Sequence, residues 1–388
     1  MSSLFAAAAL LALSATAMVG ADTIRVAIAE NARAADLRGL NIEVSELGCA
    51  ACTRTWRTDA VRAVASGQAV EIGGRLAPAF RLTSDAPIRM NGRDYPATLE
   101  IVRYGEGLAI VNELRLEEYI VGVLRAETSE RWPLETLRAQ AIVARTYAAF
   151  LRSSSGTRPY NIVATTTHQV YAGHVPASSP IWDAVRDTAG QVLLWDGELF
   201  PAFYHSASGG YTEDPRTVFA ARNMPALKAV RDEFSTGAPY YAWSLDLRLA
   251  DLSEILRRNG VNIGWVKAVE VTERTPSLRV SALTVHGTRG RAPMRGNDFR
   301  RMVGYEMLKS TLFAVAVDGT SAHFAGRGYG HGVGMSQWGA KAMAERGYRA
   351  EKILEYYYPG TTLGVLDDQA RAALRSPTLV PAPRPPLP

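Results

Sequence analysis

One stretch near the middle of the chain marks a change from a strand-like pattern to a helical one. It runs Leu116-Glu117-Glu118-Tyr119-Ile120-Val121-Gly122-Val123-Leu124-Arg125-Ala126-Glu127. Its apolar residues recur at the spacing of one helix face, which predicts a helix over 116–127. A short loop then leads to Pro133, a favourable first residue for a second helix, predicted over about 133–152.

Short β-strands are predicted on the N-terminal side of this helix. Apolar runs, some alternating with polar residues, are separated by Gly, Asp and Pro at strand-plus-turn intervals. The runs are 24–29, 69–72, 98–102 and 107–111. This pattern indicates several antiparallel strands, and therefore a β-rich N-terminal region over residues 22–112.

Strands and helices both follow the second helix. Strands are expected at 191–195, 202–204 and 266–286, and Asp196-Gly197 favours a hairpin turn after the first of them. Helices are expected at 249–258, 299–303, 336–346 and 350–357. We therefore predict a mixed α+β fold.

The two ends of the chain differ from the rest in composition. Residues 1–21 contain an apolar, uncharged run, and Val19-Gly20-Ala21 has the small-x-small form of a signal-peptidase site. The run is too short and too rich in Ala for a stable membrane span. We expect a signal peptide, contact with a membrane only through it, and an exported, periplasmic or extracellular product. The many prolines of residues 366–388 predict a tail that joins no core.

The overall composition is that of a globular protein with a sizeable core. Of the 388 residues, 47% are hydrophobic and 21% charged. The net charge of +5 favours an anionic polymer, either cell wall or nucleic acid, or else reflects only a basic solvated surface. No block of Lys or Arg is long enough for a nucleic-acid-binding arm, so we expect no nucleic-acid partner.

Possible metal ligands are few. Cys49 and Cys52 stand in Cys-Ala-Ala-Cys, for which an exported chain predicts a local disulfide first, free thiols second and a metal pair last. His168 and His174 lie six residues apart with no Cys, Asp or Glu between them, a spacing that does not favour zinc. We expect neither a metal site nor another cofactor.

Glu127 is the first candidate for chemistry. It ends the predicted helix, where backbone carbonyls disfavour a carboxylate, and apolar neighbours such as Trp132 would raise its pKa further. A carboxyl group that keeps its proton near neutral pH is what a general acid needs. The alternative is a solvated or Arg-paired glutamate. Arg145, among small apolar residues of the next helix, would hold Glu127, bind a substrate carboxylate or form a structural pair.

A polar stretch follows the expected strand at 202–204. It reads His205-Ser206-Ala207-Ser208-Gly209-Gly210 and invites a serine-hydrolase interpretation. It has no Gly-x-Ser-x-Gly elbow, and no Asp is placed to orient His205. We therefore favour a loop that lines a substrate over a catalytic triad.

The stretch 326–338 is the most unusual in composition. Five glycines in nine residues allow positive φ and a close approach of the backbone to a ligand. Tyr329 and Trp338 could stack on sugar rings, and His331 could donate hydrogen bonds. The alternative is a tightly packed turn whose Ser336 caps the following helix.

Three long motifs, in this order, resemble the SpoIID/LytB family, the family of stage II sporulation protein D. The first extends from Leu116 through Glu127, Trp132-Pro133-Leu134-Glu135 and Leu137-Arg138-Ala139-Gln140-Ala141 to Ala144-Arg145-Thr146-Tyr147. The second comprises Gln169-Val170-Tyr171-Ala172-Gly173 and residues 203–210, and the third comprises 328–340 and 353–360. Order and approximate spacing agree over about 113–365.

The resemblance implies a catalytic domain over residues 113–365, a lytic transglycosylase acting on peptidoglycan glycan strands stripped of their stem peptides. The family's catalytic glutamate corresponds to Glu127 and its functional arginine to Arg145. Residues of the second and third motifs are expected to bind substrate, namely Tyr171, His205, Ser206, Ser208, Tyr329, His331, Gln337 and Trp338. Some members bind zinc near the second motif, but the matching residues 164–169 contain no cysteine.

Other members of the family enhance a cell-wall amidase, and the motifs do not separate the two activities. Glycoside hydrolysis normally needs two carboxylates. A lytic transglycosylase manages with one, because the muramyl 6-hydroxyl replaces water as the nucleophile. Since Glu127 has no obvious acidic partner in the sequence, we expect a lytic transglycosylase, with a non-catalytic, wall-binding enhancer of an amidase as the alternative.

Overall fold

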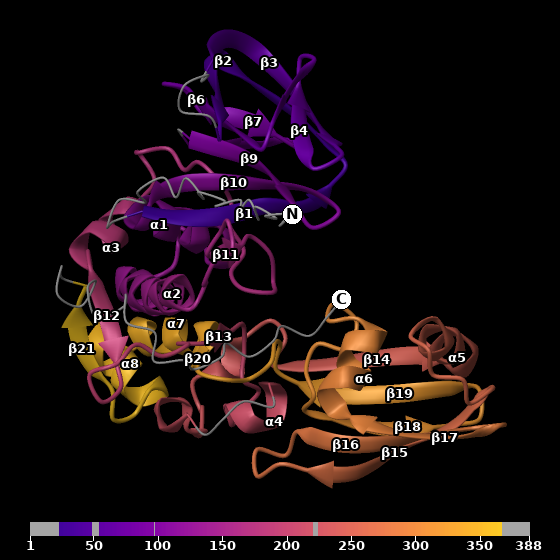
Figure 1. Ribbon diagram of the computed structural model, residues 1–388. Coiled ribbons are helices and arrows are strands. Elements are labelled where there is room, and N and C mark those ends of the chain that lie inside the picture. The colour runs from indigo at the N-terminus through magenta and orange to yellow at the C-terminus, as the bar shows by residue number, and fades with distance from the viewer. Residues whose placement is uncertain (1–22, 49–53, 97, 220–223, 367–388) are drawn as a thin grey trace, which may run out of the picture. The chain divides into compact units, whose positions relative to one another are not determined.

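The computed structural model describes residues 23–48, 54–96, 98–219 and 224–366. They form two compact units. The first contains the described residues up to Gly122 and the segment Ser155–Val175, and the second contains Val123–Ser154 and the described residues from Pro176 onward. Strands dominate the first unit and the second mixes strands with helices, which confirms the α+β fold class (Figure 1).

One eleven-stranded sheet forms the framework of the first unit. Its strands are β1 (Thr23–Ala32), β2 (Ala34–Leu47), β3 (Thr55–Ser66), β4 (Ala69–Ile72), β5 (Arg75–Ala77), β6 (Ala79–Thr83), β7 (Ile88–Met90), β8 (Arg93–Tyr95), β9 (Thr98–Tyr104), β10 (Gly107–Arg115) and β11 (Ile162–Val163). The order is β11-β1-β10-β9-β6-β2-β3-β4-β5, with β7 pairing β2 and β8. Parallel pairing of β11 with β1 explains why a segment beyond residue 112 belongs to this unit.

Side chains that alternate along the strands build the core of this sheet. On β2, Ile42 and Val44 are fully buried, and on β6 Phe80 and Leu82 are fully buried as well. Residues between them are more exposed, as expected of strands with one face on a core. A slip of one residue would turn these four side chains to the other face, so the apolar pattern fixes the register.

A charged cluster lies across four neighbouring strands of the same sheet, β1, β10, β9 and β6. The buried carboxylate of Glu100 accepts hydrogen bonds from Arg25 and from Arg81, the latter at 2.6 Å, and Glu113 pairs with both arginines. Burial works to raise the pKa of Glu100, but the hydrogen bonds and charges of Arg25 and Arg81 outweigh it and lower that pKa. Glu100 is therefore ionised in the folded chain.

The second unit contains most of the helices. They are α1 (Leu116–Glu127), which begins in the first unit, α2 (Leu134–Ser153), α3 (Ile181–Asp187), α4 (Pro215–Phe219), α5 (Leu249–Arg258), α6 (Gly296–Val303), α7 (Gln337–Glu345) and α8 (Ala350–Tyr357), with short 3-10 helices at Pro225–Leu227 and Ser235–Gly237. The bounds predicted for α1, α5 and α8 are confirmed. Helix α2 is buried along most of its length and packs against α3, α7, α8 and β12 (Gln191–Leu194).

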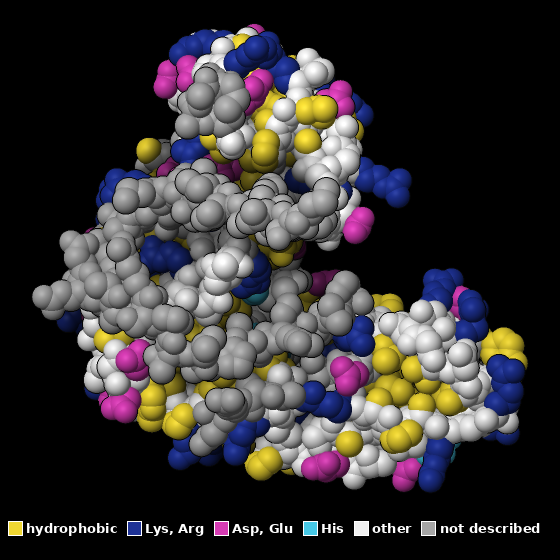
Figure 2. All heavy atoms as spheres, viewed as in Figure 1, with side chains coloured by type: hydrophobic (Ala, Val, Ile, Leu, Met, Phe, Trp, Pro, Cys, Tyr) yellow, Lys and Arg dark blue, Asp and Glu magenta, His cyan; other side chains and the backbone are white. Residues whose placement is uncertain are grey.

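Residues 242–327 form a part of this unit with its own hydrophobic core, here called the inserted lobe because it separates the second motif from the third. Its strands are β14 (Ala242–Arg248), β15 (Val266–Arg274), β16 (Val280–Gly287), β17 (Gly290–Arg295), β18 (Phe313–Val317) and β19 (Ser321–Arg327). They form the sheets β14-β19-β18 and β15-β16-β17, and Leu252, Leu283 and Phe299 are fully buried in the core. Figure 2 shows hydrophobic side chains on the visible face of this lobe and Lys and Arg side chains along its outer edge.

Two short strand pairs complete the second unit. Strand β12 pairs antiparallel with β21 (Thr362–Val365), and β13 (Tyr204–His205) pairs parallel with β20 (Met335–Ser336). Asp196-Gly197 does form a turn with positive φ at both residues, and Trp195 bridges to Glu198 across it. The pairing stops there, and the N–H of Leu193 donates to the Thr146 hydroxyl at 2.9 Å instead, so this turn does not join β12 and β13 into a hairpin.

Three expectations lie outside the described residues, namely the signal peptide, the Cys49–Cys52 pair and the Pro-rich tail from residue 367 onward. In the part of the chain that the structure describes, no helix combines the length and apolar character needed to cross a bilayer.

Candidate functional site

Pairing between β13 and β20 brings the second half of the second motif beside the third motif. In this parallel pair Tyr204 lies opposite Met335 and His205 lies opposite Ser336. One turn further, the N–H of Trp338 donates to the carbonyl of Ser206 at 3.0 Å. Two stretches more than 120 residues apart therefore form one packed unit.

Glycines permit this close packing of the backbones. At Gly334, φ is +72°, and a Cβ would lie 1.9 Å from the carbonyl oxygen of Phe203. At Gly332, φ is +88°, and a Cβ would lie 2.6 Å from the guanidinium carbon of Arg279. Ser336 then accepts a hydrogen bond from the N–H of Gly339 and caps α7. The stretch is thus the packed turn considered as one alternative above.

The start of α7 reaches the end of α1. The Gln337 side chain is buried, and its amide donates to the backbone carbonyl of Glu127 at 3.4 Å and lies 3.5 Å from the side-chain oxygen of Gln140. The rings of Trp132 and Trp338 meet edge to face, with centroids 5.3 Å apart. The structure therefore brings Glu127, Gln337 and Trp338 together from motifs about 200 residues apart, and it adds Gln140 and Trp132.

Glu127 itself is partly exposed at the last position of α1. Glu130 is the next acidic residue in the chain, and its carboxylate is engaged by a hydroxyl and a guanidinium. Its carboxylate accepts from the Ser179 hydroxyl at 2.6 Å and lies 3.6 Å from the Arg125 guanidinium. Glu130 is therefore not oriented as a second catalytic carboxylate.

Arg145 lies in the interior of the second unit and has no exposed surface. Its guanidinium donates to the carbonyls of Gln191 at 3.0 Å and of Ala141 and Val185 at 3.4 Å. These bonds join α2 to α3 and to the start of β12. These hydrogen bonds help to hold the fold around Arg145, and the catalytic role expected of it stays a prediction.

His205 and His331 lie next to each other, with ring centroids 5.6 Å apart. The Nδ1 atom of His205 lies 3.1 Å from the carbonyl of Val333, and its Nε2 is buried with no hydrogen-bond partner among the described residues. Burial holds the pKa of His205 well below its usual range, and burial together with the Arg300 charge lowers that of His331 to about 3. Both rings are therefore neutral at physiological pH.

The two serines of the second motif have different roles. Ser208 is fully buried, and its hydroxyl donates to the Asp232 carboxylate at 2.6 Å. Ser206 is partly exposed, and its carbonyl holds Trp338. Because His205 contacts a backbone carbonyl rather than a carboxylate, the residues do not form a serine-hydrolase triad. Asp232, which the sequence reasoning missed, also accepts from the Tyr357 hydroxyl at 2.9 Å.

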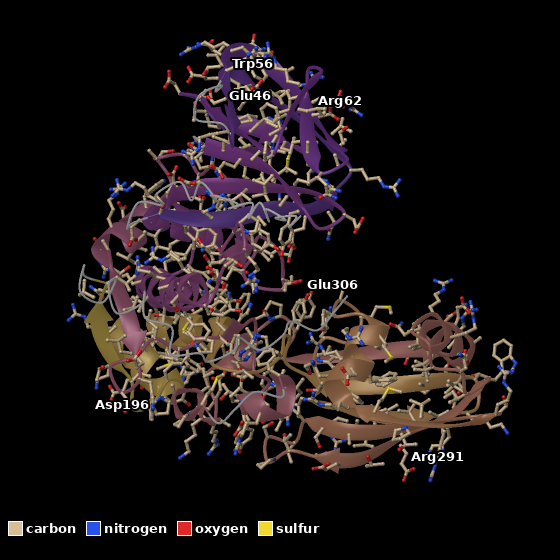
Figure 3. All side chains as sticks on the ribbon, in the orientation of Figure 1. Glu46, Trp56, Arg62, Asp196, Arg291 and Glu306 are labelled. Atoms are coloured by element: carbon tan, nitrogen blue, oxygen red, sulfur yellow. The ribbon has the colours of Figure 1, made fainter. Side chains whose placement is uncertain are left out.

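Tyr329 belongs to a second, more exposed aromatic group. Its hydroxyl donates to Glu306 at 2.6 Å, and its ring meets Tyr240 edge to face at 5.2 Å (Figure 3 labels Glu306). The ammonium group of Lys309 lies 4.3 Å from the Tyr240 ring centroid and 5.0 Å from that of Tyr329. Burial and then the Glu306 hydrogen bond raise the pKa of Tyr329 to about 12. A neutral, partly exposed ring of this kind remains suited to contact with a sugar.

Tyr171 is a core residue of the first unit. It is fully buried, its hydroxyl donates to Asn112 at 3.0 Å, and its ring lies so close to Gly122 that a Cβ there would be 2.3 Å away. Its side chain therefore has no surface free for the expected contact with substrate. His168, in the same unit, accepts a hydrogen bond from the N–H of Val163, and burial lowers its pKa to about 4. Among the described residues, no three His, Cys, Asp or Glu side chains gather as a metal site would require.

Comparison with known proteins places these features in a family. The family described as "Stage II sporulation protein" matches residues 104–195, and a domain of unknown function matches residues 217–334, which include the inserted lobe. Stage II sporulation protein D of Bacillus subtilis is 30% identical over 273 residues, covering 66% of this chain and 76% of that protein. Stage II sporulation protein D of Bacillus amyloliquefaciens is 29% identical over 313 residues, which cover 76% of this chain and 87% of that protein.

A third relative carries a different name. The amidase enhancer of Bacillus subtilis is 32% identical over 290 residues, which cover 62% of this chain but only 40% of that longer protein. The family match over residues 104–195 includes Glu127. The chain therefore belongs to the SpoIID/LytB family, the family of stage II sporulation protein D.

Proposed function

We propose that this protein is a lytic transglycosylase that cleaves denuded peptidoglycan glycan strands, with Glu127 as its general acid and base. The observation that carries the proposal is the hydrogen bond from the Gln337 side chain to the Glu127 backbone, together with the packing of the next residue, Trp338, against Trp132. The pair of tryptophans suits chemistry on a sugar, because aromatic rings pack against the apolar faces of pyranoses, and Trp338 directly follows the residue that contacts the Glu127 backbone.

The proposed chemistry needs one carboxyl group. Protonated Glu127 gives its proton to the bridging glycosidic oxygen as the bond to the muramyl C1 breaks. The resulting carboxylate then takes the proton of the muramyl 6-hydroxyl, whose oxygen closes on C1 to form the 1,6-anhydro ring. The carboxyl group regains its proton, and no water is consumed. The engagement of Glu130 by Ser179 and Arg125 fits a mechanism without a second carboxylate.

Gln337 would act as a positioning residue in this scheme. It belongs to the first turn of α7, whose start is fixed by the Ser336 cap and by the hydrogen bond from Trp338 to Ser206. Its amide contacts the backbone of Glu127 and not the carboxyl group. Its replacement should therefore change the orientation of Glu127 while leaving the acid itself in place.

A second candidate function follows from the amidase enhancer among the relatives. Such a protein would bind peptidoglycan and stimulate a cell-wall amidase without cutting glycan. Under either function we propose that the protein is exported and acts on the cell wall. The two functions differ in whether Glu127 is needed.

Glycan release from denuded strands tests the proposal. Wild type should release soluble fragments, Glu127→Gln should release none, and Glu130→Gln, the matched control three residues away, should keep most of the activity. Circular dichroism should show that all three proteins are folded. An inactive wild type, or a Glu127→Gln variant as active as wild type, would refute the transglycosylase. Stimulation of an amidase by both proteins would then favour the enhancer.

A further inference from the structure

A cleft of about 910 Å³ opens in the second unit, and none of its lining residues belongs to the group around Glu127. It is bounded by the turn after β12, by residues 224–233 and by the end of α8. Figure 3 labels Asp196, the residue that follows Trp195 in this turn. The volume is at the upper end of the range of ligand sites, about 300–1,000 Å³.

Two aromatic side chains line the cleft, and both are held in place. Trp195 exchanges both backbone hydrogen bonds with Glu198 at 2.9 Å, and Gly360 packs against its ring. The Tyr356 hydroxyl donates to the carbonyl of Arg231, and its ring meets that of Phe234 edge to face at 5.3 Å. Aromatic rings that are fixed before binding lose little conformational entropy when a ligand packs against them.

Positive charge also reaches the cleft. Arg216 is paired with Asp214 at 2.6 Å, so these two charges offset each other. Lys228 and Arg231 are exposed and form no ion pair with any described residue, while the exposed Glu233 is the remaining acidic group of the lining. The cleft therefore carries a surplus of one positive charge and two cations that can donate hydrogen bonds to a carboxylate.

We propose that this cleft is a second glycan site, which binds a muramyl residue through its free lactyl carboxylate. Lys228 and Arg231 bind the carboxylate, and Trp195 and Tyr356 pack against the sugar. The proposal rests on the proposed function, because removal of the stem peptide is what frees that carboxylate. The cleft then selects strands already stripped of peptide and holds them while Glu127 acts at another position of the strand.

Calorimetric titration of the Glu127→Gln protein tests the cleft without cleavage of the ligand. The probes are a denuded glycan oligosaccharide, a chito-oligosaccharide of equal length without carboxylates, and free stem peptide. The cleft predicts two sites for the glycan in this background and one site after Lys228→Gln with Arg231→Gln. The dissociation constant of the glycan at the cleft should rise at least about tenfold in this double variant, as expected when charge-assisted hydrogen bonds are removed. The control Lys352→Gln, on α8 and paired with Glu355, should retain both sites.

Three results would overturn this assignment. They are equal binding of chito-oligosaccharide and glycan, unchanged glycan binding by the double variant, and displacement of the glycan by stem peptide. Failure of the cleft and failure of the proposed function are distinguishable. A wild type that cuts glycan while the double variant binds normally refutes the cleft alone. A wild type that cuts nothing, with the predicted loss of one site in the variant, refutes only the chemistry at Glu127.

Discussion

The packing of the glycine-rich stretch against β13 predicts that Gly334→Ala is far more damaging than an alanine at an open glycine. An alanine at φ +72° costs about 1–2 kcal/mol in backbone strain. Its Cβ would also lie 1.9 Å from the carbonyl oxygen of Phe203, a contact that only backbone movement can relieve. Overpacking of this kind costs about 1–3 kcal/mol more. The free energy of unfolding should therefore fall by about 2–5 kcal/mol.

Gly347→Ala is the matched control, because Gly347 has φ +85° and no atom within 4 Å of its Cβ position. Its free energy of unfolding should fall only by the cost of backbone strain, about 1–2 kcal/mol. In a folded unit of this size, 1 kcal/mol shifts the melting temperature by about 2–4 °C. Differential scanning calorimetry should place the melting temperature of Gly334→Ala roughly 2–12 °C below that of Gly347→Ala. Equal melting temperatures for the two variants would refute the inferred close packing.

Three further predictions concern buried polar groups. Ser208→Ala should lower the free energy of unfolding by about 1.5–3 kcal/mol in urea titrations, because Asp232 loses a charge-assisted hydrogen bond, and a loss under about 0.5 kcal/mol would contradict this. The pKa of Glu100 is lower in the folded chain than its ordinary 4.5, so unfolding takes up a proton and stability should fall below about pH 4.5. Glu100→Gln should flatten that acid dependence, and an unchanged pH profile would count against it. The NMR shifts of the His205 and His331 rings should stay constant from about pH 5 to 8, since both pKa values lie below this window, and a titration within it would disprove their burial as neutral groups.

Much of the helical structure could be predicted from the sequence, because its signals are local. The apolar spacing from Leu116 and the proline at 133 predicted α1 and α2 to within about a residue. Strand partners are not local in this way. Asp196-Gly197 predicted the turn correctly, but the partner of β12 is β21, about 170 residues further along the chain. Nothing in the sequence near a short strand specifies such a distant neighbour.

The candidate site was likewise predictable in part, since motifs identify residues but not their tertiary surroundings. Motif order identified Glu127, Gln337 and Trp338, which do come together in the structure. The sequence did not distinguish polar residues that face a ligand from those that hold the fold. Ser208 belongs to the second kind, because it is fully buried and its hydroxyl donates to the Asp232 carboxylate. Burial is set by tertiary packing, which a motif does not encode.

Cleavage of denuded glycan in water enriched in heavy oxygen distinguishes ring closure by the sugar's own hydroxyl from hydrolysis. A lytic transglycosylase closes the anhydro ring with the sugar's own hydroxyl, so no oxygen from water enters the product. We expect soluble fragments that end in 1,6-anhydromuramyl residues and carry no heavy oxygen, and we expect none with Glu127→Gln. Fragments whose reducing ends carry heavy oxygen would show hydrolysis instead and would contradict the role assigned to Glu127.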